Sequence, residues 1–358
     1  MISVSAPAPR HFDHLGVRLL AVAALTIGEC LVFQRLLFQD RQEYEFVLAS
    51  ISGVLSGYPV SKSWQHRFLG PWLVRALDPM TGSALLSLEL FTWVALLLAN
   101  VSLFVLLQKR GASPTRSYFA VCCFVLAHAL FAYRLEYAWD GIDAVLFMSF
   151  GFWVARGGPL WALLPLLLVG TLNHETALYI PFWYVLSALP WPSTSCSLLD
   201  GYETRNEVPV CRTNGREGRN IAARARTLLG AGATLAAMLG AIWALRERYY
   251  IGNPHLPGQA HEEQTPLISN HLHIAHNLNQ LFIADWYKGR EHISAAIWLT
   301  IALLSRELVN NTRHALAALW TLCVFATIVC FGYVNETRHY LLLMAFWFAY
   351  AWPTQAHE

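Results

Sequence analysis

The stretch GSALLSLELFTWVALLLANVSLFVLL, residues 82–107, carries one charged side chain, Glu89, among apolar and small uncharged residues. An α-helix needs about 20 mainly apolar residues to cross the hydrocarbon core of a bilayer. Because this stretch exceeds that length, it predicts a membrane-spanning helix.

The composition of the whole chain is typical of the same class of protein. Its 358 residues are 56% hydrophobic and only 13% charged, whereas soluble domains average about 25% charged residues. Trp and Tyr, which favour bilayer interfaces, are abundant. The net charge is only +2, and no basic run is present, so we expect no nucleic-acid partner.

Further apolar stretches follow the same criterion. The predicted spans are 15–38, 82–107, 117–135, 142–156, 159–173, 176–190, 227–245, 292–305, 315–333 and 338–352. The fold class predicted is therefore all-α, a polytopic transmembrane helical bundle of about ten spans, forming a single integral membrane domain over residues 1–358. Several spans are short, and these can be tilted, re-entrant or shielded by neighbouring helices.

Basic residues indicate the sidedness, because short cytoplasmic loops carry an excess of Lys and Arg. With the N-terminus inside, the short inner loops carry Lys109, Arg110, Arg116, Arg156, Arg306 and Arg313. The short outer loops carry only Arg134 and Arg338. Both termini are then cytoplasmic. The long segments become a cytoplasmic loop at 191–226 and two outer loops, 39–81 with an interfacial helix at 41–56, and 246–291.

Ionisable residues at the ends of spans gather on the outer side. Charge at membrane depth is costly, so such residues usually face a protein interior or a wet cavity. We therefore expect one outward-facing site. Its predicted substrate-binding or phosphate-binding residues are Arg67, Arg134, Asp140, Asp143, Asn173, His174, Glu175, Glu336, Arg338 and His339.

Two related motifs stand out in this set, Asn173-His174-Glu175-Thr176 and Asn335-Glu336-Thr337-Arg338. One interpretation is helix capping, since Asn is a good N-cap and Glu in a first turn complements the helix dipole. Asp140 and Asp143 fit that interpretation too. The other adds a function, because converging helix N-termini can bind an anion such as phosphate.

Three arginines favour phosphate as the ligand. Arg67 lies in an apolar, aromatic run, Arg134 ends a span, and Arg338 opens one next to His339. Arginine binds phosphate through a planar fork. The alternative is that these side chains snorkel to lipid headgroups.

Asp40 and Glu43 follow the first span directly and are the candidate catalytic residues. A carboxylate there can act as a general base towards a hydroxyl acceptor. The alternative is an ordinary solvated helix start. His and Glu residues of 246–291 show no specific ligand spacing, so no metal-binding residue is predicted, and a divalent cofactor is left open.

These residues together resemble bacterial polytopic proteins related to the GT-C-type glycosyltransferases. The resemblance rests on the acidic loop after the first span and on Arg67-Phe68-Leu69-Gly70-Pro71-Trp72. It also rests on the stretch 170–177, GTLNHETA, and on Asn335-Glu336-Thr337-Arg338. Many of those proteins carry Asn-Arg-Glu-Thr where this chain has Asn173-His174-Glu175-Thr176.

The resemblance implies transfer of a sugar from a polyprenyl-phosphate donor to an acceptor on the extracytoplasmic face of a bacterial inner membrane. It implies a base from the first outer loop, best matched by Asp40 with Glu43 as the alternative, and basic groups that grip the lipid phosphate. The expected partners are membrane lipid and the lipid-linked donor.

Two other functions stay open. A transporter or flippase would explain the short spans as broken helices. A non-catalytic membrane assembly factor is compatible with every feature above. Mid-span charge is sparse, with Glu29 and Glu89 as the main exceptions.

Overall fold

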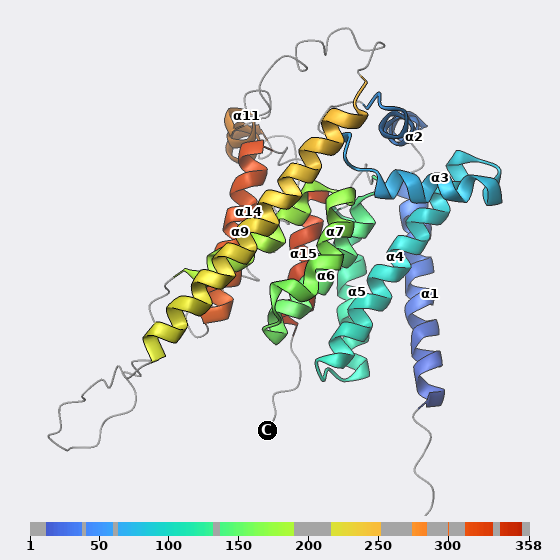
Figure 1. The fold of residues 1–358 in the computed structure, drawn as a ribbon. Helices are drawn as coiled ribbons and strands as arrows, with labels where there is room; N and C mark the ends of the chain where they lie inside the picture. Colours follow the sequence, from blue (N-terminus) through green and yellow to red (C-terminus); the bar gives the residue numbers. More distant parts are fainter. Residues whose placement is uncertain are drawn as a thin grey trace, which may run out of the picture.

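The computed structural model describes residues 12–37, 41–59, 64–131, 137–189, 216–251, 274–284, 300, 312–331 and 337–352. This part of the chain is almost entirely helical and contains no strand, as the sequence predicts (Figure 1). In chain order the elements are α1 (Phe12–Leu37), α2 (Arg41–Ser56), α3 (Leu69–Thr81), α4 (Ala84–Lys109), α5 (Pro114–Phe131), α6 (Asp140–Arg156), η2 (Leu160–Leu163), α7 (Leu164–Asn173), η3 (Glu175–Leu178), α8 (Tyr179–Ala188), α9 (Arg216–Tyr249), α11 (Ile274–Asn279), the π-helical η5 (Gln280–Ala284), α14 (Thr312–Phe331), η6 (Thr337–Tyr340) and α15 (Leu341–Ala351).

Each predicted span coincides with a helix or a pair of helices, except 292–305, which lies outside the described residues apart from residue 300. By length and composition, three described helices can cross a membrane: Ala84–Lys109, Ile221–Tyr249 and Arg313–Phe331. The predicted interfacial helix coincides with α2.

The three long segments predicted as loops need correction, because the described part of each contains more helix than predicted. Helix α9 begins at Arg216, inside the predicted loop 191–226, and α11 and η5 lie within 246–291. In the segment 39–81, α2 is accompanied by another helix. A second helix, α3, covers Leu69–Thr81. Its two prolines are Pro71, in the first turn, where proline is tolerated, and Pro79, close to the end. Figure 1 shows α3 running across the bundle rather than along it.

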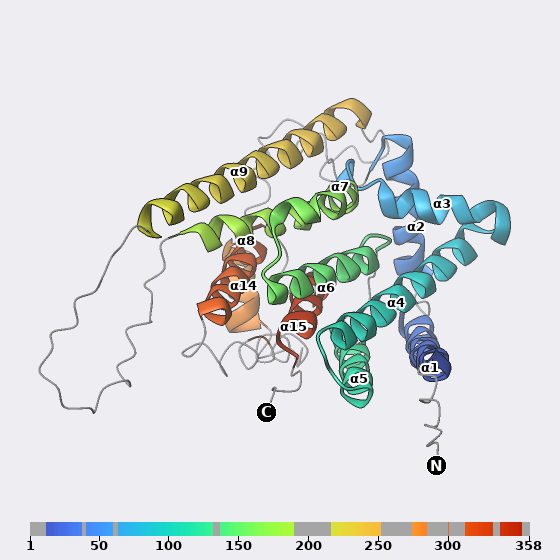
Figure 2. The same ribbon diagram turned by 60° about the horizontal axis from the view of Figure 1, so that its bottom comes forward.

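The core is centred on α6 and α15, which lie side by side (Figures 1 and 2). Every side chain of α15 from Leu341 to Tyr350 is buried, as expected for a helix that is apolar all round. Phe346 packs 4.6 Å from Trp320 of α14 and 5.3 Å from Phe150 of α6, centroid to centroid. Gly151 lets α6 approach this helix closely, since a Cβ there would meet the carbonyl oxygen of Phe346.

The chain turns at two opposite ends of the bundle. At one end the Arg110 Nη1 donates to the Ala349 carbonyl at 2.6 Å, and Arg156 donates to the Lys109 carbonyl at 3.3 Å. We call this the Arg110 end. At the other, the Arg67 end, the loop before α3, the turn before α6 and the break between α7 and η3 meet. Lys109, Arg110 and Arg156, which the sequence groups on one side, thus lie together at the Arg110 end.

Candidate functional site

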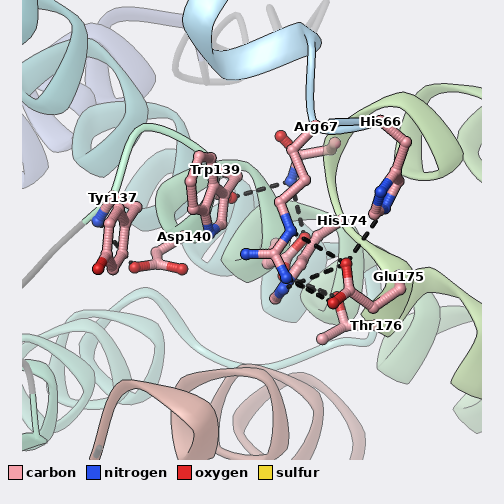
Figure 3. A network of polar contacts seen from close by, with 10 residues as sticks. His66, Arg67, Tyr137, Trp139, Asp140, His174, Glu175 and Thr176 are labelled. Atoms are coloured by element: carbon pink, nitrogen blue, oxygen red, sulfur yellow. Dashed lines mark hydrogen bonds and ion pairs between the residues drawn. The ribbon is translucent and has the colours of Figure 1, made fainter. Parts of the chain in front are cut away.

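The centre of the Arg67 end is an ion pair between Arg67 and Glu175. Arg67 Nε lies 3.0 Å from Glu175 Oε2, and Nη2 donates to Oε1, so the guanidinium binds both oxygens of the carboxylate (Figure 3). The Arg67 side chain is 7% exposed and that of Glu175 is 34% exposed. This is the planar, bidentate geometry in which arginine binds carboxylate or phosphate.

The loop that carries Arg67 is fixed by local contacts. Gln65 Nε2 donates to the Val54 carbonyl of α2 at 2.8 Å, and the Arg67 N–H donates to the Trp64 carbonyl at 2.9 Å. Three residues on, Gly70 presses against the turn before α6, where an added Cβ would lie 2.6 Å from the Ala138 carbonyl oxygen. Only glycine fits this approach, so Gly70 sets the position of Arg67 relative to α6.

Aromatic rings form one wall of the site. The Arg67 Cζ lies 4.9 Å from the Trp139 ring centroid and 5.6 Å from that of Trp64. Tyr137 stacks on Trp139, with centroids 4.8 Å apart and planes within 5°. Such cation–π contacts are stronger when the cation is withdrawn from water, as here. They hold the guanidinium plane in one orientation.

His66 lies between Glu175 of the ion pair and Arg246 and contacts both. Its Nδ1 accepts a hydrogen bond from Arg246 Nε, at the end of α9, at 3.2 Å. The proton of the neutral ring then sits on Nε2, which lies 3.1 Å from Glu175 Oε2, although off the direction of an ideal hydrogen bond. Burial lowers the pKa of His66 to about 4, against the opposing influence of the Glu175 carboxylate. The ring is therefore neutral at pH 7.

Glu175 keeps its charge in this setting. Burial raises the pKa of its carboxyl, but the positive Arg67, the nearby His174 and the contact with His66 outweigh burial and hold the pKa well below its usual range. The 34% exposure of its side chain means that water reaches one side of the carboxylate. Glu175 is thus the water-accessible anion of an otherwise buried cluster.

A second network surrounds Asp143, one turn into α6. Its Oδ1 accepts from Asn173 Nδ2 at 2.8 Å, and its Oδ2 accepts from Thr176 Oγ1 at 2.7 Å. His174 Nδ1 lies 2.6 Å from the same Oδ2. The other ring nitrogen, Nε2, lies 3.7 Å from Glu175 Oε2, so His174 connects the two networks.

Side-chain capping does not explain Asn173 and His174. Asn173 is the last residue of α7, and its amide also donates to the Trp139 carbonyl at 2.9 Å. Neither α6 nor η3 has a side-chain hydrogen bond from its N-cap residue. Asp140 accepts from the Tyr137 N–H at 2.9 Å and so stabilises the turn before α6. Asp140, Asp143 and Glu175 stand in the first turns of α6 and η3, where a negative charge complements the helix dipole, as the capping interpretation predicts.

The structure brings together six residues predicted from the sequence: Arg67, Asp140, Asp143, Asn173, His174 and Glu175. Asp40, Arg134 and Glu336 lie outside the described residues. Glu43 and Arg338 are placed by their backbone only, in α2 and η6. His339 is half-buried in η6, which packs against α5 and α15.

Sequence reasoning missed His66 and Arg246. His66 directly precedes Arg67, and Arg246 directly follows the predicted span 227–245, so position alone could have indicated both. Within the described ranges, no group of three or more His, Cys, Asp or Glu residues is arranged to hold a metal ion.

A separate polar cluster lies among α1, α4 and α5. Glu29, 2% exposed, lies 2.9 Å from His128 Nδ1 through Oε1 and accepts from Asn100 Nδ2 at 2.6 Å through Oε2. The Asn100 amide also donates to Thr26 Oγ1 at 3.1 Å. These residues belong to three helices, without contribution from a described loop.

No protein-family model, no curated protein and no solved structure matches the chain. The fold and the site therefore define a helical protein with helices long and apolar enough for a membrane and a charged cluster at one end. Any assignment of function depends on the chemistry of that cluster.

Proposed function

We propose that this protein is a membrane-embedded transferase that moves a sugar from a polyprenyl-phosphate donor to a hydroxyl acceptor, at the Arg67 end. In this proposal the chain crosses the inner membrane of a bacterium about ten times, as in GT-C-type glycosyltransferases, with the Arg67 end on the extracytoplasmic face.

The observation that carries the proposal is the Arg67–Glu175 pair. A carboxylate and a phosphate present oxygens to guanidinium with the same planar fork geometry. Glu175 is partly exposed, so a phosphate can approach the pair and exchange with the carboxylate on Arg67. The Trp139 and Trp64 rings keep the guanidinium in place during such an exchange.

The remaining requirements of the reaction come from the sequence. The acceptor hydroxyl needs a group that takes its proton, for which Asp40 and Glu43 of the first outer segment are candidates. Arg134, Arg338 and His339 are further candidates for holding the donor phosphate. A membrane setting supplies the lipid-linked donor directly.

The test compares two arginine variants in purified protein reconstituted into liposomes. The donors are undecaprenyl phosphates linked to radiolabelled glucose, mannose or galactose, and the acceptor is an octyl glycoside. We expect Arg67→Met to reduce transfer at least about 100-fold, as for loss of one electrostatic contact to the reacting group. The matched control Arg75→Met should leave it unchanged, because Arg75 is 72% exposed and its ion-pair partner among the described residues is Asp78.

Equal transfer by wild type and Arg67→Met would contradict the proposal, as would absence of transfer from wild type with every donor. Transfer by Asp40→Asn and by Glu43→Gln at the wild-type rate would remove the two sequence-based candidates for the base.

One observation favours a second function, that of a transporter or flippase. Glu29 and His128 form a titratable pair deep in a helix bundle, and such pairs are frequent in the proton relays of transporters. Flux of a fluorescent undecaprenyl phosphate across the liposome membrane, without transfer of sugar, would support this alternative.

A further inference from the structure

We infer that His174 is the catalytic base of this site and that Asp143 is its positioning residue. The inference rests on the proposed sugar transfer and differs from the sequence-based expectation, which placed the base on Asp40 or Glu43 and treated His174 as a binding residue.

The contacts of Asp143 fix the tautomer of His174. Asp143 Oδ2 already accepts from Thr176 Oγ1 at 2.7 Å, and an ionised carboxylate can only accept. The His174 Nδ1, 2.6 Å from that oxygen, must therefore carry a proton and donate it. In the neutral ring this leaves the lone pair on Nε2.

The carboxylate that does this is itself held rigidly. Asn173 Nδ2 donates to Asp143 Oδ1 at 2.8 Å and to the Trp139 carbonyl at 2.9 Å, so it ties the carboxylate to the backbone of its own turn. Thr176 Oγ1 lies 3.1 Å from His174 Nδ1 as well. Asp143 and Thr176 thus hold the Nδ1 side of the ring, and Asn173 holds Asp143. A carboxylate orients a catalytic imidazole in this way.

His174 Nε2 faces Glu175 and lies 3.7 Å from its Oε2, too far for a direct hydrogen bond. An acceptor hydroxyl about 3 Å from Nε2 can donate its single proton to that nitrogen, whereas the Glu175 carboxylate, also an acceptor, takes no part in that hydrogen bond. In this proposal the hydroxyl approaches past the Glu175 side chain, which is 34% exposed. The contacts of Asp140, with the turn before α6, give no such arrangement.

The chemical step then balances. The acceptor oxygen forms a bond to the anomeric carbon, and the bond from that carbon to the phosphate oxygen breaks. The bonding pair leaves with the lipid phosphate, which stays bound to Arg67. The hydroxyl proton moves to His174 Nε2, and the resulting imidazolium lies between the carboxylates of Asp143 and Glu175 before it releases the proton to water.

The first test measures the same liposome transfer reaction. His174→Asn keeps a donor near Asp143 but removes the base, and we expect transfer to fall at least about 100-fold. His174→Gly should regain part of the lost rate when imidazole is added, which a purely structural histidine would not allow. The control His276→Asn changes an exposed histidine of α11 and should transfer like wild type.

The second test needs no substrate. Solid-state NMR of protein labelled with ¹⁵N-histidine in bilayers, with His174 assigned by its loss in His174→Asn, should give the Nδ1–H tautomer in wild type. Asp143→Asn should shift the population towards Nε2–H. These spectra also reveal whether the variants remain folded.

The outcomes separate the two proposals. Wild-type transfer with an equally active His174→Asn would overturn the base while sugar transfer stands. An Nε2–H tautomer in wild type would overturn it too. If wild type transfers no sugar from any donor, the proposed function fails first, and the role of His174 as its base falls with it.

Discussion

The Arg67 end and the α1–α4–α5 cluster both bury ionisable groups, but they do so differently. At the Arg67 end a permanently charged guanidinium faces a partly exposed carboxylate, and the contacting side chains come from the loop before α3 and from the ends of several helices. In the α1–α4–α5 cluster, Glu29 meets an imidazole and an amide, all inside helices and almost fully buried.

The difference teaches what each arrangement can do. Helix-borne groups that satisfy each other without access to water hold helices together, since each would be costly to bury alone. Groups in loops and at helix ends, where one anion is partly exposed, can exchange a partner for a ligand. The following predictions test this division, from the largest effect on stability to the smallest.

Glu29→Ala should have the largest effect on stability. It leaves His128 and Asn100 facing an apolar cavity, and removal of one partner from a buried polar pair costs about 3–5 kcal/mol. Glu29→Gln keeps an acceptor for Asn100 and should cost less than about 1.5 kcal/mol. Unfolding by SDS titration of the protein in mild detergent measures both. A Glu29→Ala protein as stable as wild type would show that the cluster does not hold the helices together.

Acidification should destabilise the protein through His66. Above pH 6.5 the ring is neutral in both states. Between pH 6.5 and about 4 the unfolded chain binds a proton at His66 that the folded chain does not. Lowering the pH through this range therefore lowers the free energy of unfolding. The total loss is about 3 kcal/mol.

Glu175 adds to this loss at lower pH. Its folded pKa is depressed, so its contribution is present above the ordinary carboxyl pKa and is lost as pH falls further. The free energy of unfolding, measured from pH 8 to pH 4, should decline less in His66→Gln, because glutamine does not titrate in the folded or the unfolded state. The same decline in that variant as in wild type would contradict the assignment.

The smallest expected effect is a difference in coupling energy between an ion pair at the site and one at the surface. In double-mutant cycles, Arg67→Met with Glu175→Gln should give a coupling energy of about 1–3 kcal/mol, because the two residues are in bidentate contact. Arg75→Met with Asp78→Asn should give about 0–1 kcal/mol, because Arg75 is largely exposed. Equal coupling in both cycles would mean that water screens the Arg67 pair as fully as the surface one.

The positions of the helices could be predicted from the sequence because apolar length decides them. The stretch 82–107 became α4, Ala84–Lys109, and 41–56 became α2. The start of α9 was predicted at 227 but lies at Arg216. The first turns of α9 contain arginines, which are good helix formers but are not detected by a search for long apolar stretches. Helix α3 was missed for a related reason, since its 13 residues are too few for a span.

The site could be predicted only in part. Topology brings Asp143 and Glu175 to one end of the bundle, because both lie at the outer ends of predicted spans, and Arg67 belongs to the first predicted outer loop. Which side chain meets which depends on the packing of α3, α6 and α7. The Arg67–Glu175 contact joins residues 108 positions apart, and no local pattern encodes that pairing. The sequence predicts His174 as a binding residue, and only its contact with Asp143 shows how the imidazole ring is oriented.

The close approach at Gly70 has a consequence for the recognition of distant relatives. Since a single methyl group there would collide with the backbone of Ala138, a chain that builds the same guanidinium fork needs glycine three positions after its arginine. The expected pattern is an arginine with that glycine, an aspartate one turn into a later helix, and then Asn-x-Glu-Thr. Distant relatives should keep these few residues, because the geometry of the site requires them, even where the rest of the sequence differs.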